Sequence, residues 1–529
     1  MIAKPKSTKF IAWTVKALAL EVDLKARMRL GDLLIGAKLV TAEQVAEALN
    51  YQGQYGGRLG ELLVETGALT QEAMDAFLYR MPTEPKNLAS TNIHESELLI
   101  LLIKLIYTGR LETVRQFVEA IKLPYHVVLE MIPKAIDRQL LRALGMRDSE
   151  NLADMSYTLT EEGRRRAQDA LQQSRYAGPA PVTLDEFVEM IGRQKLSNET
   201  VTYRRIREAM GKLIFDASMI EKSGPALNAG RSMLLYGPPG NGKTSVALSF
   251  AKVFDDVIYV PYAVMIEGQI MRVFDASVHA MLDEPAGGDD NPYSFIRQEE
   301  YDARWVPCRR PFVIAGGELT LEMLDLRYDP IANFYEAPLH VKALGGCFII
   351  DDFGRQLVSP ANLLNRWIVP LESRVDYLKL HTGKSFTIPF EELVIFSTNL
   401  DPEDLMDPAF LRRLPYKIEV GAPSLELYRQ IFEQECERGG LVLSDNMFDL
   451  IVHKIINEKG LEVAAFQPKF ITDQILATCR FMDTPPHFEP RFIDYAIDNL
   501  RVHQHGAPVK RPSPVPARAY EEEVTYWAS

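Results

Sequence analysis

The segment Gly237–Thr244 combines glycines, a lysine and a hydroxyl residue at the spacing GxxxxGK[ST] of a phosphate-binding loop, the P-loop. Glycines at these places let consecutive backbone N–H groups point inward and cradle phosphate oxygens. Lys243 would reach the β- and γ-phosphates, and the Thr244 hydroxyl would hold Mg²⁺. The apolar run 232–236 before the loop predicts its strand, and the run 246–251 predicts its helix. We therefore expect a nucleoside triphosphate site made by Gly237, Pro238, Pro239, Gly240, Asn241, Gly242, Lys243, Thr244 and Ser245.

Carboxylates and an amide follow two further apolar runs. Residues 347–350 predict a buried central strand, and Asp351 and Asp352 come directly after it. Asp351 would complete the Mg²⁺ shell beside Thr244, and Asp352 would polarise an attacking water. A third run, 393–398, ends in Asn399, whose amide can orient that water. Together with the P-loop, these side chains predict metal-assisted hydrolysis of a nucleotide.

These motifs together resemble those of the AAA+ ATPases. The resemblance makes 237–244 the Walker A motif, 347–352 the Walker B motif and Asn399 sensor 1, and it covers roughly residues 195–500. In that family an arginine finger from a neighbouring subunit contacts the γ-phosphate, which implies this role for Arg412 or Arg413 and a ring, most simply a hexamer. Lys469 occupies the place of sensor 2.

Two residues depart from the family pattern, because Asp352 stands where most members have glutamate and Lys469 where most have arginine.

Alternating strand and helix signals over 185–420 predict a parallel sheet covered on both sides, and 421–500 predicts an all-helical lid. Residues 376–390 predict a β-hairpin with its turn at Thr382-Gly383. The segment 283–345 is longer than the family's usual connection, and no role is assigned to it.

An internal repeat occupies the N-terminal region. Arg29–Ile35 recurs as Arg58–Val64, and each copy predicts a short helix, a turn and a longer helix. Thr41 and Gln44 predict a capping box for the first long helix. A duplicated helical hairpin that only packs would satisfy the pattern.

The repeat also resembles the MshEN domain of type II secretion and type IV pilus ATPases, which implies a bacterial protein that binds cyclic di-GMP. In this interpretation the arginines meet guanine or phosphate, the glycines admit the ligand to the backbone, the leucines contact the rings and the glutamine contacts a base edge. The implied ligand residues are Arg29, Leu30, Gly31, Leu33, Gln52, Arg58, Leu59, Gly60 and Leu62. The copies differ at Lys38, which corresponds to Gly67, and the second copy ends at Met81 rather than at glutamine.

Residues 93–176 predict three helices, a strand pair and a final helix, and the stretch 157–167 resembles the wing-to-helix segment of winged-helix domains. A DNA-reading helix should carry a basic stripe. The expected recognition helix instead places Glu130 and Asp137 beside Lys134 and Arg138. This balance favours docking to protein, or a spacer role, over DNA binding.

Composition sets outer limits on the interpretation. With 529 residues, 47% hydrophobic and 25% charged, the chain is not wholly disordered, collagen-like or a disulfide scaffold. A net charge of −13 argues against non-specific nucleic-acid binding by the whole surface. Four scattered cysteines suit a reducing compartment, and no apolar run reaches the roughly 18 residues of a membrane span. Because Lys16 interrupts the apolar run near the start, we expect no signal peptide and a cytoplasmic protein.

The predicted architecture is multidomain α/β: an MshEN-like helical repeat at 1–85, a winged-helix-like module at 93–176, an AAA+ α/β core at 185–420, a helical lid at 421–500 and a flexible tail at 501–529. The predicted function is a ring-forming AAA+ ATPase that uses ATP and Mg²⁺, responds to cyclic di-GMP and acts on a protein client the sequence does not name. Two alternatives stay open: a DNA-associated regulatory ATPase that reads DNA with the winged helix, and an ATP-dependent scaffold with slow turnover.

Overall fold

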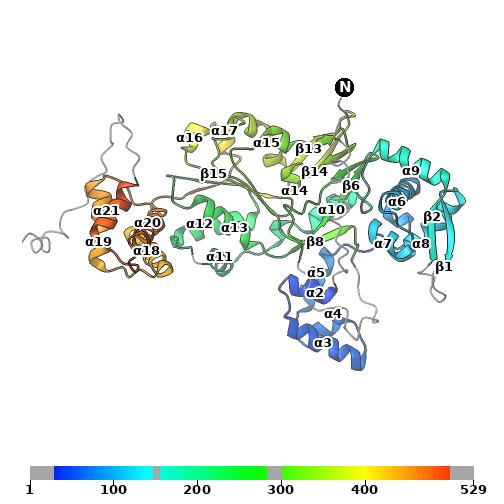
Figure 1. The fold of residues 1–529 in the computed structure, drawn as a ribbon, viewed down its shortest axis with the longest axis horizontal. Helices are drawn as coiled ribbons and strands as arrows, with labels where there is room; N and C mark the ends of the chain where they lie inside the picture. Colours follow the sequence, from blue (N-terminus) through cyan, green and yellow to red (C-terminus); the bar gives the residue numbers. More distant parts are fainter. Residues whose placement is uncertain (1–28, 147–154, 212, 283–300, 501–529) are drawn as a thin grey trace, which may run out of the picture.

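The structure is a computed structural model that describes residues 29–146, 155–211, 213–282 and 301–500. It is a multidomain α/β protein in which a central parallel sheet lies between helical regions (Figure 1). The C-terminal helices lie at one end of the molecule and the helices of residues 95–173 at the other. The acidic stretch 283–290 and the predicted tail from residue 501 lie outside the described residues.

The central sheet has five parallel strands in the order β16-β4-β15-β12-β9. The strands are β4 (Met233–Tyr236), β9 (Phe312–Ala315), β12 (Cys347–Ile350), β15 (Leu393–Thr398) and β16 (Tyr416–Glu419). Strand side chains alternate between the two faces, and both faces are buried at the central strands β4, β12 and β15. Leu235 and Ile349 pack with the helices α11 (Tyr203–Met210), α12 (Ala217–Ala229) and α13 (Lys243–Val253). Leu234 and Phe348 pack on the other face with α15 (Pro360–Ser373), as the sequence predicts for a sheet covered on both sides.

A second sheet of five strands, in the order β10-β11-β7-β6-β3, lies beside the first. Its strands are β3 (Val182–Thr183), β6 (Ala263–Ile266), β7 (Gln269–Arg272), β10 (Arg327–Asp329) and β11 (Phe334–Glu336). A separate antiparallel pair joins β5 (Val257–Pro261) to β8 (Trp305–Arg309). The described part of the segment 283–345 thus supplies β8, β10 and β11, together with β9 of the central sheet.

The repeat forms two helical hairpins, which we call the repeat module: α2 (Leu30–Gly36) with α3 (Ala42–Tyr55), and α4 (Leu59–Glu65) with α5 (Gln71–Arg80). The capping box at Thr41 and Gln44 is present, with both hydrogen bonds formed. Lys38 and Gly67 hold equivalent turn positions with φ of 57° and 73°, so both copies turn through a left-handed residue.

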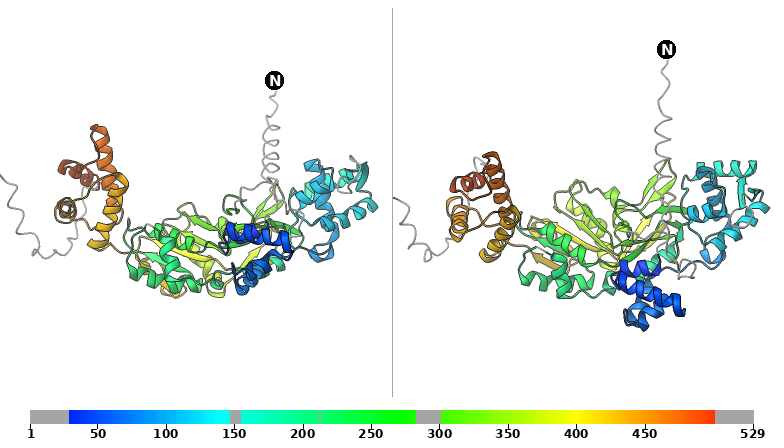
Figure 2. Two further views of the ribbon diagram at one scale, coloured as in Figure 1. Left: turned by 90° about the horizontal axis from the view of Figure 1, so that it is seen from below. Right: turned by 60° about the horizontal axis from the view of Figure 1, so that its bottom comes forward.

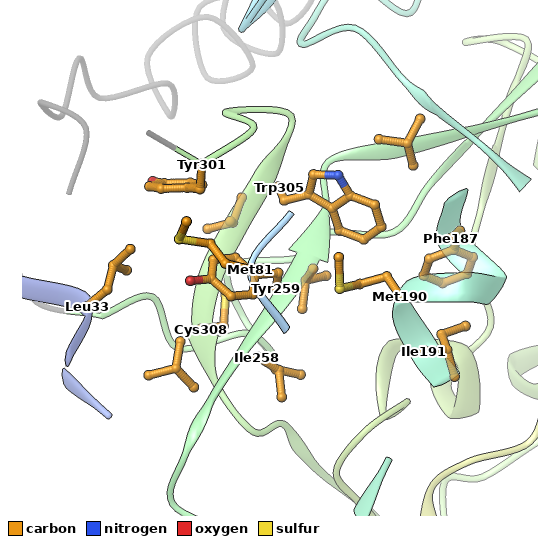
Figure 3. Close-up of a cluster of buried hydrophobic side chains, with 14 of the residues drawn as sticks. Leu33, Met81, Phe187, Met190, Ile191, Ile258, Tyr259, Tyr301, Trp305 and Cys308 are labelled. Atoms are coloured by element: carbon orange, nitrogen blue, oxygen red, sulfur yellow. The ribbon is translucent and has the colours of Figure 1, made fainter. Parts of the chain in front are cut away.

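The repeat module packs against the β5–β8 pair. Leu33 of α2 and Met81, just after α5, share one buried cluster with Tyr259, Tyr301 and other side chains of the core (Figure 3). Met81, the residue that follows α5, is therefore packed rather than exposed. Arg80 reinforces the contact through ion pairs of 2.6 Å to Glu199 and 3.0 Å to Asp256.

Residues 95–173 form the elements predicted for them, and we call them the middle module. They are α6 (Glu95–Gly109), α7 (Val114–Ile121), α8 (Tyr125–Asp137), β1 (Leu141–Met146), β2 (Met155–Leu159) and α9 (Glu161–Gln173). The strands pair antiparallel, and the residues between them lie outside the described part. Ala263 and Met265 of β6 pack with the middle module's core, so the second sheet carries this module. Ala180, which precedes β3, is also buried in this core.

The C-terminal helices are α18 (Leu425–Gly439), α19 (Asp445–His453), α20 (Gln467–Phe481) and α21 (Pro490–Asp498), so this segment is all-helical as predicted (Figures 1 and 2). The predicted hairpin is also present, as β13 (Val375–Lys379) and β14 (Ser385–Pro389), with Gly383 at a φ of 90° in its turn. The remaining helices are α10 (Leu184–Arg193), α14 (Leu339–Lys342), α16 (Pro402–Leu405) and α17 (Pro408–Leu411). None of the helices in the described ranges has the length and apolar character needed to cross a membrane.

Candidate nucleotide-binding site

The P-loop connects β4 to α13, so it has the strand before it and the helix after it that the motif requires. Gly237 has a φ of 138°, and a Cβ there would lie 2.5 Å from the carbonyl oxygen of Val420. Only glycine therefore fits where the loop leaves the sheet. Lys243 is buried, and its ammonium donates to the carbonyl oxygens of Gly237 at 3.0 Å and Pro238 at 2.9 Å. Burial lowers the pKa of Lys243, and the two carboxylates after β12 oppose that shift.

The Thr244 hydroxyl and Asp351 meet across the top of the sheet. The hydroxyl donates to the Asp351 carboxylate, with distances of 2.9 Å to Oδ2 and 3.1 Å to Oδ1. This brings together the two residues that the sequence assigned to Mg²⁺. Among the described residues, no group of three or more His, Cys, Asp or Glu could hold a metal by itself. A Mg²⁺ bound by one carboxylate and one hydroxyl needs phosphate oxygens and water to complete its octahedron, which is the usual arrangement for this ion.

Asp352 and Asn399 are also in contact, as the sequence placed them. The Asn399 amide donates to Asp352 Oδ1 at 2.9 Å. Asp352 has a φ of 48°, a left-handed conformation uncommon for a residue other than glycine. Gln356 supports this turn by donating from its side chain to the carbonyl oxygens of Asp351 at 2.8 Å and Asp352 at 3.2 Å. The sequence analysis missed Gln356, because no motif marks a glutamine that folds back on its own turn.

Sheet order explains why these side chains converge. β15, which ends before Asn399, lies between the P-loop strand β4 and the strand β12 that precedes Asp351. All three strands are parallel, so their carboxyl ends meet at one edge. The site is thus built from distant segments, since Thr244 and Asp351 are 107 residues apart and Asp352 and Asn399 are 47 apart.

The start of α20 contacts the tip of the P-loop. The Phe466 N–H donates to the Gly240 carbonyl at 2.9 Å, and the Ala465 N–H donates to Asn241 Oδ1 at 3.1 Å. A Cβ on Gly240 would lie 2.4 Å from the Phe466 ring. The sequence analysis missed this contact. Lys469, predicted to be sensor 2, is largely exposed and pairs with Asp473 of its own helix at 2.6 Å, so its ammonium is engaged on α20.

Arg412 and Arg413 lie at the opposite end of the sheet from the P-loop. They precede β16, whose Tyr416 pairs with the first residue of β4 and whose Glu419 pairs with the last. The four residues of β16 span roughly 10 Å at about 3.3 Å each. The strand length therefore separates both arginines from the P-loop of their own chain. Arg413 also forms an ion pair of 3.0 Å with Glu372.

The residues implied for cyclic di-GMP fall into two groups in the structure. The four leucines and Gln52 are buried, and the leucines belong to the module's packed core. A Cβ on Gly31 would lie 2.8 Å from Val45, so this glycine permits close helix packing. Arg29 is half-buried and Arg58 is exposed, at equivalent places before α2 and α4. In this conformation the leucines offer no open apolar surface to a ligand, and cyclic di-GMP binding stays a prediction.

A family model described as a domain of unknown function (DUF8689) matches residues 424–499, the segment of the C-terminal helices. No curated protein matches the chain. Similar solved structures include a mutant of RuvB from Thermotoga maritima, at 11% identity and a TM-score of 0.32, covering 55% of this chain and 72% of that one. They also include NtrX from Brucella abortus in complex with ADP, at 14% identity and a TM-score of 0.34, covering 65% of this chain and 68% of that one. Both similarities are distant.

Proposed function

We propose that the chain binds and hydrolyses ATP as an AAA+ ATPase that works in a ring. The observation that carries the proposal is the convergence at one sheet edge of the P-loop, the Thr244–Asp351 pair and the Asp352–Asn399 pair. A phosphate-binding loop alone fits many nucleotide sites. A hydroxyl–carboxylate pair beside it, with a second carboxylate held by an amide, is suited to phosphoryl transfer to water.

Each side chain has a distinct task in this proposal. Lys243 exchanges its two backbone carbonyl partners for phosphate oxygens, which a buried ammonium binds strongly because little water competes. Thr244 and Asp351 hold Mg²⁺, and the ion supplies neutralisation of charge on the phosphates. Asp352 accepts a proton from the attacking water, and Asn399 fixes the direction of that carboxylate.

The position of Arg412 and Arg413 supports assembly. Because the strand length separates them from the P-loop of their own chain, they can contact a nucleotide only on a second copy. A chain that carries the P-loop at one end of its sheet and the arginines at the other forms a head-to-tail contact, and such contacts give a ring when the rotation from one copy to the next closes. We propose a homo-oligomeric ring, most simply a hexamer.

The middle module is proposed to dock protein. Lys134 of α8 and Arg138 just after it both pair with Glu95 of α6, at 2.5 Å and 2.7 Å, so both basic side chains of the expected recognition helix are engaged within the module and part of their charge is offset. DNA binding as the main role is therefore the less favoured alternative. Cyclic di-GMP is proposed as a regulatory ligand of the repeat module, with Arg29 and Arg58 as its accessible contacts.

Slow turnover is a second candidate, favoured by one observation. Lys469 is paired on α20 rather than free to contact phosphate, and the start of α20 rests on Gly240. An ATP-dependent scaffold would keep nucleotide bound for long periods in such a site.

The test is phosphate release from MgATP by the purified full chain, together with Lys243→Ala. We expect turnover by the wild type and neither binding nor turnover by the variant. Tight ATP binding with fewer than one turnover per hour would favour the scaffold. Absence of ATP binding by the folded wild type would contradict both candidates.

A further inference from the structure

A cavity of about 650 Å³ opens at the amino end of the central sheet, away from the P-loop. Its walls come from the segment between the end of α12 and the start of β4, from the end of α15 and the residue after it, and from the segment that leads into β16. Three stretches that are distant in sequence, at 229–232, 371–374 and 412–416, thus meet around one space. Ligand pockets in proteins commonly have volumes of about 300–1,000 Å³.

Charge in the lining is strongly one-sided. Four arginines and one glutamate face the cavity, namely Arg231, Arg374, Arg412, Arg413 and Glu372, and we call it the arginine cavity. Like charges held this close repel one another, and the repulsion is stronger where low-dielectric walls limit screening. A bound anion would relieve it.

The pairing of the four guanidinium groups differs. Arg374 pairs with Glu391 at 3.0 Å and Arg413 with Glu372 at 3.0 Å. Arg231 and Arg412 are exposed, and neither forms an ion pair with any residue in the described ranges. Two guanidinium groups without an ion pair among the described residues, those of Arg231 and Arg412, therefore line the same cavity from different segments. A planar guanidinium binds phosphate oxygens through two parallel hydrogen bonds, which makes it the preferred side chain for such anions.

We propose that the arginine cavity binds the polyphosphate group of a nucleotide, with Arg231 as a contact in addition to Arg412 and with Arg413 leaving Glu372 to join them. Where the phosphates belong to a nucleotide held by the P-loop of a neighbouring copy, the inference rests on the proposed function and adds Arg231 to the residues that act between copies. Where the nucleotide is free in solution, the cavity is a second nucleotide site, separate from the P-loop. Arginine binds phosphate oxygens in both cases, and ATP turnover by Arg231→Ala distinguishes the two sources.

The first experiment removes the P-loop as a binding site. Full-length Lys243→Ala is titrated with tripolyphosphate by calorimetry at constant ionic strength. We expect saturable binding that Arg231→Ala weakens about tenfold, the loss of a charged hydrogen bond. Glu372→Gln should strengthen binding, because it removes the one carboxylate of the lining and its ion pair with Arg413.

Arg204→Ala is the matched control, because Arg204 is an exposed arginine of α11 that pairs with Glu208 of the same helix. It should leave the affinity unchanged. No saturable binding, or binding that Arg231→Ala and Arg204→Ala alter equally, would overturn the proposal. Melting temperatures equal to that of the parent protein show that the variants are folded.

The second experiment identifies the source of the phosphates. In the wild-type P-loop background, Arg231→Ala should lower the rate of ATP turnover at assembled protein concentrations, with the Kd for ATP at the P-loop unchanged, when the phosphates belong to a neighbouring copy. Unchanged turnover together with lost tripolyphosphate binding assigns the cavity to free nucleotide. If the chain hydrolyses no ATP at all, the proposed function fails, while the calorimetry on Lys243→Ala still decides whether the arginine cavity binds polyphosphate.

Discussion

The side-chain amide of Asn399 donates a 2.9 Å hydrogen bond to Oδ1 of Asp352, joining the ends of β15 and β12. This bond occupies one carboxylate oxygen of Asp352, so Oδ2 is the oxygen that would accept the proton of the proposed attacking water. Aspartate is one methylene shorter than the glutamate that most AAA+ ATPases carry here. The left-handed conformation of Asp352, with Gln356 bracing the turn, sets where the shorter side chain points.

Replacing the proposed base should separate binding from hydrolysis. Asp352→Asn keeps the shape of the side chain and removes its capacity to accept a proton, so the Kd for ATP should stay within about threefold and kcat should fall at least about 100-fold. Asp404→Asn, an exposed aspartate of α16, is the control and should keep the wild-type rate. Wild-type turnover by Asp352→Asn would show that another group activates the water.

The Thr244 hydroxyl should matter only when Mg²⁺ is present. Thr244→Val removes the hydroxyl that contacts Asp351 and keeps the branched shape, whereas Thr244→Ser keeps the hydroxyl. We expect the valine variant to lose the gain in ATP affinity that Mg²⁺ gives, and the serine variant to retain most of it. The measurement is ATP titration with Mg²⁺ and with a chelator. Equal Mg²⁺ dependence in both variants would remove Thr244 from the metal shell.

Catalysis between copies predicts recovery of activity on mixing. An Arg412→Ala, Arg413→Ala double variant keeps its P-loop, and Lys243→Ala keeps its arginines. Each variant alone should be inactive, and loss of the arginine pair should lower kcat by about 10³-fold or more. Mixed assemblies should regain part of the activity, because an intact arginine pair then faces an intact P-loop. Mixed assemblies, verified by mass, that stay inactive at every ratio would show that the arginines do not act between copies.

The sequence predicted the site because each of its parts is a local pattern. The P-loop, the carboxylate pair after β12 and the amide after β15 each follow a short apolar run, and parallel strands bring such ends together. The hairpin at 376–390 and the helix caps of the repeat were predictable for the same reason, since the residues that make a turn or a cap are neighbours in sequence.

Other features depended on residues far apart, and local patterns do not carry them. β3 has two residues and lies in a Pro- and Gly-rich stretch, so its strand character comes only from pairing with β6. Lys38 stands where the second copy of the repeat has Gly67, and in the fold its ammonium donates to Asp255 of the α/β core. Nothing near Lys38 in sequence indicates that partner. Arg231 likewise lies far in sequence from the segment before β16, so the sequence did not predict that the two line the same cavity.

Acid should weaken the junction between the second sheet and α14 through His279. Its Nδ1 accepts from the Asp275 N–H at 2.9 Å, and its Nε2 lies 2.9 Å from the Lys342 carbonyl oxygen, so the buried ring is neutral with its proton on Nε2. Burial lowers the pKa of His279 from 6.5 to about 4. The unfolded chain binds the proton first, so the stabilisation is complete above pH 6.5 and is lost as pH falls toward 4.

The loss has a ceiling of about 3 kcal/mol at 1.36 kcal/mol for each pKa unit. Denaturant unfolding between pH 7 and 4 should show it, and His279→Gln, which keeps a donor for the Lys342 carbonyl, should flatten the curve in this range. His453→Gln, at an exposed site, is the control. An equal slope in His279→Gln and wild type would assign the acid sensitivity to other groups.

Cyclic di-GMP binding should be tested on the full chain, because the repeat module shares its buried cluster with β5 and β8 and an isolated fragment would expose Leu33 and Met81. Arg29 and Arg58 stand at equivalent places before α2 and α4, so a ligand with two guanines and two phosphates can meet both. Arg29→Ala and Arg58→Ala should each weaken binding by about tenfold or more, with Arg204→Ala unchanged. The four leucines are packed inside the module. If the guanine rings reach these leucines, saturating cyclic di-GMP should raise hydrogen exchange in α2 and α4. If the arginines alone hold the ligand, hydrogen exchange there should stay unchanged or fall. Absence of heat and of any shift in melting temperature at millimolar ligand would leave the repeat module as a docking element, held to the core by Lys38, Arg80 and the cluster around Tyr259.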